Sequence, residues 1–354
     1  MTSNPFYFGG RISNLEQFVG REDTIRFIIQ RMTGPQMTSV AVVGERRIGK
    51  SSLLHHIYQT YAQRIEDSQR FLIAEVSLQE AQVRDREGFV STVSNRLQRA
   101  LTGHSRANHL PVRSVPCTEL ADLESRLQEL SEADLRVVVC LDEFEELLEN
   151  REAFNNRFYD AMRALLDAQH LMLVIASTRP LTYYGQHYQL VSRFFNLTNS
   201  LSLGELTEDE ARTLLTRPAT FGETRPALGA MDSQLALRLG GRHPFFLQMA
   251  AHYVFEAQVH GHDEAWIQRQ FDVQARQHYS GWRRHQRSVW RGILRGPAWL
   301  GRAVVTVGMR QDDVGNIMVG FAVIVVVILA LLGWLPMAPL WEWLKGLLGV
   351  GAGS

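Results

Sequence analysis

The chain has 354 residues, enough for one large domain or two smaller ones with ample core. Its formal charge at pH 7 is zero, but acids outnumber bases up to residue 275 and bases outnumber acids beyond it. Two cysteines, Cys117 and Cys140, exclude a disulfide framework and a cysteine-based metal site, which fits a reducing compartment. Because the N-terminus has no apolar stretch, we expect no cleavable signal peptide.

The first twenty residues predict irregular structure. They contain Asn4-Pro5-Phe6, Gly9-Gly10 and Phe18-Val19-Gly20-Arg21. Helical spacing of apolar residues follows over residues 21–32 and ends at Gly34-Pro35. An apolar run over residues 38–43 then predicts a strand.

A phosphate-binding loop follows this strand, since residues 44–51 read G-x-x-x-x-G-K-S and a helical pattern comes next. The glycines let the N–H groups of the loop turn inward, and the helix adds its positive N-terminal end. Lys50 is expected to reach the β- and γ-phosphates, and Ser51 to bind Mg²⁺. Only two of the 37 Lys and Arg residues are lysines, so Lys50 is a compact ammonium in a chain that otherwise uses arginine. The predicted nucleotide-binding residues here are Gly44, Glu45, Arg46, Arg47, Ile48, Gly49, Lys50, Ser51 and Ser52.

An acidic pair follows a second strongly apolar run. Between the two motifs we expect a strand at residues 70–78 and amphipathic helices at 86–101 and 118–131. The continuous apolar run over residues 135–141 is typical of a central parallel strand covered on both faces. Asp142 comes next, where a Walker-B aspartate would hold Mg²⁺, and Glu143 stands where a carboxylate would orient the attacking water. Glu145 and Glu146 are expected on the solvated face of the following helix.

Two further strands and a helical region complete the predicted elements of this part. Apolar runs predict strands over residues 171–176 and 201–203. The first run is followed by Ser177-Thr178-Arg179-Pro180. One interpretation of these four residues is a simple turn at the end of the strand, set by Pro180. Residues 207–210 form a T-x-x-E capping box before a helical region, and Pro244 is well placed as the first residue of a later helix.

These motifs resemble those of the AAA+ and STAND groups of P-loop NTPases, over roughly residues 4–260. The resemblance implies a three-layer α/β fold with parallel strand order 5-1-4-3-2 and a helical lid. It also implies that the protein is an ATPase. No N-K-x-D segment that would read guanine is present, so the nucleotide is expected to be ATP rather than GTP. It implies that the box Phe18, Val19, Gly20 and Arg21 lies along the adenine and ribose, an ordinary helix start being the alternative. It also implies that Arg179 senses the γ-phosphate and that Pro244 packs on the adenine, with a plain helix cap as the alternative for the proline. Since relatives assemble, a homo-oligomer is expected.

The C-terminal part combines arginines with a long apolar run. Residues 263–287 have helical spacing, and eight arginines and no acid lie between Arg276 and Arg310, interleaved with tryptophans. This pattern fits either a nucleic-acid surface or a membrane surface. The nineteen uncharged residues 317–335 are long enough as a helix to span a hydrocarbon core of ~30 Å, which favours the membrane and argues against nucleic acid. Arginines on the N-terminal side predict a single-pass protein of the cell membrane with a cytoplasmic N-terminus.

The sequence predicts five segments: an ATPase core at residues 1–204, a helical lid at 205–275, a basic juxtamembrane segment at 276–316, a transmembrane helix at 317–335 and a tail at 336–354. Our first hypothesis is a membrane-anchored ATPase that acts as a nucleotide-dependent signalling switch, with ATP, lipid and an unidentified protein as partners. Water near Glu143 would attack the γ-phosphate while Mg²⁺, Lys50 and Arg179 neutralise charge. Arg157 and Arg163 are candidates for an arginine finger. Two alternatives stay open: a nucleic-acid-binding ATPase of the origin-recognition type, and an adaptor that binds ATP without hydrolysing it.

Overall fold

The computed structural model describes residues 4–104, 117–196, 199–218 and 226–278. The sheet and the helices that cover it belong to the unit of residues 1–271. Within the described ranges no helix has the length and apolar character needed to cross a membrane. The predicted membrane-spanning segment 317–335 lies outside the described residues, as do the basic segment from residue 279 onward and the tail.

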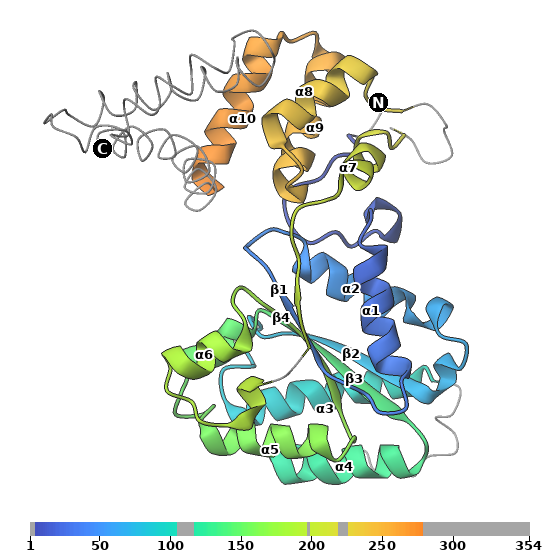
Figure 1. Ribbon diagram of the computed structural model, residues 1–354, viewed down its shortest axis with the longest axis vertical. Helices are drawn as coiled ribbons and strands as arrows, with labels where there is room; N and C mark the ends of the chain where they lie inside the picture. Colours follow the sequence, from blue (N-terminus) through green and yellow to red (C-terminus); the bar gives the residue numbers. More distant parts are fainter. Residues whose placement is uncertain (1–3, 105–116, 197–198, 219–225, 279–354) are drawn as a thin grey trace, which may run out of the picture. The chain divides into compact units, whose positions relative to one another are not determined.

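Five parallel strands form the centre of the core (Figure 1). They are β1 (Val40–Val43), β2 (Phe71–Ser77), β3 (Arg136–Asp142), β4 (Met172–Ser177) and β5 (Asn199–Ser202). Their order across the sheet is β2-β3-β4-β1-β5, which confirms the predicted order. Val43 pairs with Ser177 and Ser77 pairs with Asp142, so the carboxyl ends of these strands meet at one edge of the sheet.

Helices cover both faces of the sheet and make the fold a three-layer α/β structure (Figure 1). On one face lie α1 (Glu22–Thr33) and α2 (Lys50–Arg64), and on the other α3 (Arg86–Thr102), α4 (Leu120–Glu132) and α5 (Asn156–Asp167). Successive residues of β3 enter different clusters of the core. Val138 and Cys140 pack in the cluster of α1 and α2, whereas Val137 and Val139 pack in the cluster of α3, α4 and α5. The run is continuously apolar because neither face of β3 meets water.

Short helices occupy several connections between these elements. They are the 3₁₀-helices η1 (Leu15–Gln17), η2 (Ser68–Arg70), η4 (Phe144–Glu149) and η5 (Arg193–Asn196), and α6 (Leu181–His187). The helix expected after the acidic pair is therefore a 3₁₀-helix. Its tighter winding changes which side chains face the core.

Within the described residues, four helices follow β5, and we call them the lid. They are α7 (Glu208–Leu215), α8 (Ala230–Gly240), α9 (Pro244–His260) and α10 (Glu264–His278). The predicted capping box is confirmed, because the Glu210 N–H donates to Thr207 Oγ1 at 3.2 Å and the Thr207 N–H donates to the Glu210 carboxylate at 2.7 Å. Pro244 is the first residue of α9, as expected. The described part of the helix predicted at residues 263–287 ends at His278.

The N-terminal segment connects the lid with the core. We call residues 4–12 the strap. At its start, Asn4 Nδ2 donates to Glu256 Oε1 of α9 at 2.7 Å. At its end, the Ile12 N–H donates to Ser52 Oγ of α2 at 3.0 Å. The sequence predicted only irregular structure here, and the backbone is irregular, but the strap is held at both ends.

Candidate nucleotide-binding site

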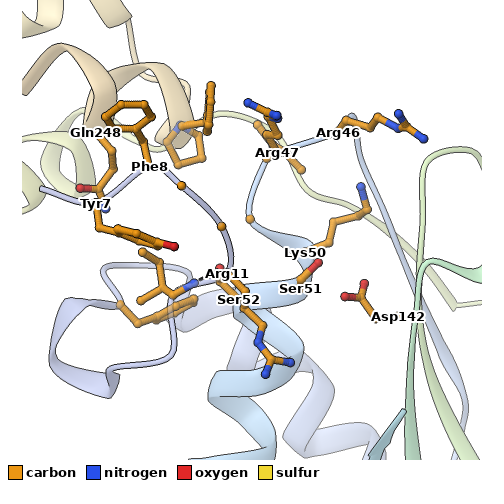
Figure 2. A pocket seen from close by; sticks show the side chains of 18 of the residues that line it. Tyr7, Phe8, Arg11, Arg46, Arg47, Lys50, Ser51, Ser52, Asp142 and Gln248 are labelled. Carbon is orange, nitrogen blue, oxygen red and sulfur yellow. Dashed lines mark hydrogen bonds between the residues drawn. The ribbon is translucent and has the colours of Figure 1, made fainter. Parts of the chain in front are cut away.

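A cavity of about 450 Å³ lies where the carboxyl edge of the sheet faces the first turn of α9 (Figure 2). Its wall comes from the strap, the box, the P-loop, the end of β3 and the lid. The predicted site residues that line it are Phe18, Val19, Arg21, Arg46, Arg47, Ile48, Gly49, Lys50, Ser51, Ser52, Asp142, Glu143 and Pro244. Gly20, Gly44, Glu45 and Arg179 are not among the lining residues. The cavity thus collects residues that lie far apart in the sequence.

The P-loop takes a path that its glycines permit. Gly49 has φ 103°, a left-handed conformation that glycine adopts without strain. At Gly44 a Cβ would lie 2.7 Å from the carbonyl oxygen of Leu203, so only glycine fits there. Ile48 is buried and fixes the loop to the core. Because α2 begins at Lys50, the positive end of its dipole lies at the cavity wall.

Lys50 lies inside the loop. Its Nζ donates to the carbonyl oxygens of Gly44 at 2.8 Å and Glu45 at 2.9 Å. Burial lowers the pKa of Lys50, and nearby carboxylates, those of Glu145 and Asp142 first, oppose this change. The ammonium is therefore held by backbone dipoles close to where phosphates would bind.

Ser51 and Asp142 form the candidate metal-binding pair. The buried Asp142 carboxylate accepts the N–H of Glu143 at 3.0 Å. Burial raises the pKa of Asp142, and its interactions with the Ser51 side chain and the Glu143 N–H oppose the rise. A hydroxyl and a carboxylate are oxygen ligands that suit Mg²⁺, which takes its remaining ligands from water and substrate phosphates. The described residues hold no cluster of three or more His, Cys, Asp or Glu side chains that could bind a metal alone.

Glu143 is half-buried beside this pair. Its φ is 57°, a left-handed conformation that is uncommon for a residue with a side chain. The pKa of Glu143 is raised to about 7, mainly by burial, and the negative charge of Asp142 contributes to the rise. Such a carboxyl group can gain or lose a proton at neutral pH, which is the property a general base needs.

Glu145 contradicts the expectation of a solvated position. Its carboxylate accepts a hydrogen bond from the Thr178 N–H and another from Tyr184 Oη at 2.8 Å. Burial alone would raise the pKa of Glu145, but these hydrogen bonds bring it below its ordinary value. The 3₁₀ winding of η4 places Phe144 fully in the core and turns Glu145 toward the end of β4. Glu145 therefore lines the cavity and holds the residue after β4.

The strand exit at β4 presents Thr178 rather than Arg179 to the cavity. Arg179 is exposed, and its guanidinium lies over the Tyr183 ring, 5.8 Å from the centroid. The role of Arg179 as a γ-phosphate sensor stays a prediction. Neither Arg157 nor Arg163 lines the cavity, and Arg163 pairs with Asp167 at 2.8 Å.

The box contacts the segment between β5 and α7, which joins the core to the lid and which we call the hinge. Arg21 has φ 66° and begins α1 as its N-cap. Its guanidinium donates to the carbonyl oxygens of Gly204 at 2.6 Å and Glu205 at 3.2 Å, in the link between β5 and α7. Phe18 stacks on His56 with 4.2 Å between the ring centroids. Phe18, Val19 and Arg21 therefore line the cavity, and Arg21 also holds the hinge. The contact of the box with adenine and ribose stays a prediction.

The first turn of α9 contacts the P-loop directly. The guanidinium of Arg47 lies 4.2 Å from the centroid of the Phe245 ring. His243 is buried, and its Nε2 is 3.4 Å from Glu45 Oε1. Burial lowers the pKa of His243 to about 4, so the imidazole is neutral at pH 7 and this contact is polar rather than ionic.

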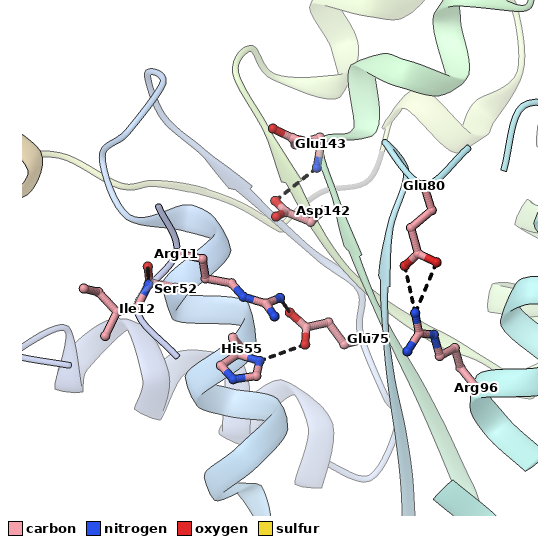
Figure 3. Close-up of polar contacts among 9 residues, drawn as sticks. All are labelled: Arg11, Ile12, Ser52, His55, Glu75, Glu80, Arg96, Asp142 and Glu143. Carbon is pink, nitrogen blue, oxygen red and sulfur yellow. Dashed lines mark hydrogen bonds and ion pairs between the residues drawn. The ribbon is translucent and has the colours of Figure 1, made fainter. Parts of the chain in front are cut away.

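The strap is the part of the site that the sequence did not reveal. Tyr7, Phe8, Gly9, Gly10, Arg11 and Ile12 all line the cavity. Arg11 Nη1 donates to Glu75 Oε1 of β2 at 2.6 Å, and His55 Nδ1 lies 2.9 Å from the other oxygen of this carboxylate (Figure 3). The sequence predicted only irregular structure for these residues. Nothing in their spacing indicated that the segment returns to the P-loop.

Solved structures with a similar fold include the following two. The Walker-type ATPase paby2304 of Pyrococcus abyssi is 16% identical with a TM-score of 0.54, over 97% of this chain and 92% of that chain. The Aeropyrum pernix ORC2 protein, in its ADPNP–ADP complexes, is 14% identical with a TM-score of 0.51, over 76% of this chain and 71% of that chain. At these identities the likeness shows the fold alone.

The comparison with family models is more specific. No curated protein sequence matches the chain. The model described as Novel STAND NTPase 1 matches residues 11–238, which contain the box, the P-loop and the acidic pair. Because this match covers more than half of the chain and all three motifs, the chain belongs to the Novel STAND NTPase 1 family of P-loop NTPases.

Proposed function

We propose that the chain binds ATP with Mg²⁺ and hydrolyses it, and that the nucleotide controls how the lid is held on the core. One observation supports this most: Lys50 of the P-loop, Asp142 of β3 and Pro244 of the lid line the same cavity. A nucleotide in that cavity touches core and lid at once. If ATP and ADP contact the lid differently, exchange of one for the other would shift the lid between two positions.

The chemistry would use residues already in place. Mg²⁺, when bound, supplies positive charge to the phosphates, and Ser51 and Asp142 would hold it. Lys50 would exchange its present carbonyl partners for phosphate oxygens. Glu143 would orient the attacking water and accept its proton, for which a pKa of about 7 is well matched.

The lid would respond through contacts with the P-loop and the hinge. Arg47 touches Phe245 at the start of α9, and Arg21 holds the carbonyl groups of the hinge. Movement of the P-loop around a phosphate would change the first contact while the second keeps the hinge in place. We infer that the family function is a nucleotide-dependent switch whose output passes to a protein partner.

The proposal includes a membrane tether at residues 317–335, supported by the sequence pattern alone. The full chain should stay in the membrane fraction after alkaline carbonate washing. Val326→Arg, which places a charge in the middle of the apolar run, should release it. Quantitative release of the unchanged chain by the wash would refute the tether.

A second candidate is a nucleic-acid-binding ATPase, favoured by the eight arginines between Arg276 and Arg310. The fold is shared with the Aeropyrum pernix ORC2 protein. Binding of the full chain to duplex DNA would be measured between about 50 and 200 mM salt, where phosphate contacts lose affinity steeply. Tight, salt-dependent binding would favour this candidate over the membrane switch.

ATP binding and turnover by the full chain test the main proposal. Wild type should hydrolyse ATP, Glu143→Gln should bind ATP without turnover, and Lys50→Ala should lose affinity for the phosphates. If wild type and Glu143→Gln both bind ATP and neither hydrolyses it, with or without lipid, the chain is a binding-only adaptor. If wild type binds no nucleotide, the proposal as a whole fails.

A further inference from the structure

The cationic side chains around the cavity differ in what they already contact. Those that line it are Arg11, Arg21, Arg46, Arg47 and Lys50. Arg11 is paired with Glu75, and Arg21 is bonded to hinge carbonyls. Arg47 rests on the Phe245 ring, and Lys50 is bonded to carbonyls of its own loop. Four of these five groups therefore have structural partners.

Arg46 is the exception. In the part of the chain that the structure describes, it has no hydrogen bond, ion pair or ring contact, and its side chain is exposed at the cavity wall. Figure 2 shows the side chains of Arg46 and Arg47 leaving the loop in different directions, with Arg46 extending toward the side on which Asp142 lies. No packing or pairing in this part of the molecule accounts for a guanidinium at this position of the loop.

Arg46 shares the cavity with the groups of the proposed reaction. Lys50, Asp142 and Glu143 line the same cavity as Arg46. Because a charged group acts over several ångströms, an exposed guanidinium at this wall can reach the place where these groups would surround the terminal phosphate.

We propose that Arg46 binds the terminal phosphate of ATP from within the same chain and stabilises the charge that develops during its transfer. This inference rests on the proposed function. A guanidinium keeps its charge at any physiological pH and can give two parallel N–H···O bonds to phosphate oxygens. It would do in cis what an arginine finger from another subunit does in other NTPases. No arginine from a neighbouring copy is then required for turnover.

Arg46→Ala in the full chain tests this proposal by comparing a non-hydrolysable ATP analogue with ADP. Affinity for the analogue should fall about tenfold to a hundredfold, the usual size of a lost charge-assisted hydrogen bond, while ADP affinity stays within about twofold. ATP turnover should fall by about a hundredfold or more. Arg46→Lys should recover part of the analogue affinity, because it restores the charge without the bidentate geometry.

A further variant separates this role from a general loss of charge. Arg26→Ala removes an exposed arginine on α1 outside the cavity and should leave turnover unchanged.

Three outcomes would overturn the proposal. Arg46→Ala with unchanged analogue affinity and turnover would show an idle surface charge. An equal loss of analogue and ADP affinity would show damage to the whole loop. Absence of nucleotide binding by wild type would remove the proposed function together with this inference, whereas the first two outcomes remove only the role of Arg46.

Discussion

Removing the aromatic anchor of the strap should loosen the cavity wall that the strap forms. Phe6 is 1% exposed, and its ring centroid is 6.4 Å from that of Phe255 in α9. The Arg217 guanidinium lies 5.9 Å from the Phe6 ring and donates to the carbonyl oxygens of Pro5 at 3.3 Å and Gln17 at 2.9 Å. Phe6→Ala would remove the ring from the centre of this contact.

The expected cost follows from the burial of the ring. A phenylalanine side chain hides about 150–250 Å², and at ~25 cal/mol per Å² this is worth about 4–6 kcal/mol. Measured Phe→Ala changes in cores cost about 3–5 kcal/mol. The strap has no regular secondary structure and is not part of the sheet, so we expect the lower value, about 3 kcal/mol. A loss of this size is a large part of the 5–15 kcal/mol that usually stabilises a domain.

Urea unfolding and nucleotide titration of the full chain would measure both consequences. Phe6→Ala should lose about 3 kcal/mol of stability and bind ATP about tenfold more weakly, because Phe8 and Arg11 would no longer be held at the cavity. Tyr7→Ala is the matched control for stability. The Tyr7 side chain, next to Phe6 in the strap, is 48% exposed, so its removal should cost less than about 1 kcal/mol. Equal stability losses in the two variants, or unchanged ATP affinity in Phe6→Ala, would show that the strap does not form the cavity wall through this anchor.

Three further predictions concern the core. ATP turnover should increase as the pH rises through about 7, because Glu143 must be ionised to accept a proton and its pKa is about 7. A flat pH–rate profile between pH 5.5 and 8.5, roughly 1.5 units on either side of this pKa, would count against Glu143 as the base. Tyr184→Phe removes the donor to Glu145 and should cost about 1–3 kcal/mol in urea unfolding, with no loss expected if the carboxylate finds another partner. Arg21→Ala should speed limited proteolysis between β5 and α7, because the Gly204 carbonyl loses its donor; an unchanged cleavage rate would mean that other contacts hold the hinge.

The parts of this site that the sequence predicted are those fixed by local chemistry. The P-loop was predictable because a strand, two glycines at fixed spacing and a helix determine its path. Asp142 was predictable because a doubly covered strand must be continuously apolar, so the first acid marks its end. The strand order followed from the family resemblance, and the structure confirms it.

The remaining site residues depend on contacts between distant segments, which no local pattern encodes. Asn4 and Glu256 form a hydrogen bond although they are 252 residues apart in the sequence. Both residue types are common on protein surfaces, so neither indicated this contact. Glu145 has the spacing of a solvated helical face, and only the 3₁₀ winding of η4 and the partner Tyr184 give it a different role.

Arg46 and Arg47 show where such prediction ends. They are adjacent, identical in type and equally polar, so a sequence pattern assigns them the same function. Both are exposed and line the cavity, but Phe245, almost two hundred residues later, provides a ring for the guanidinium of Arg47 and not for that of Arg46. A difference in function between the two arginines would therefore originate in the lid rather than in the P-loop. The fold of the lid would decide which arginine remains available to a phosphate.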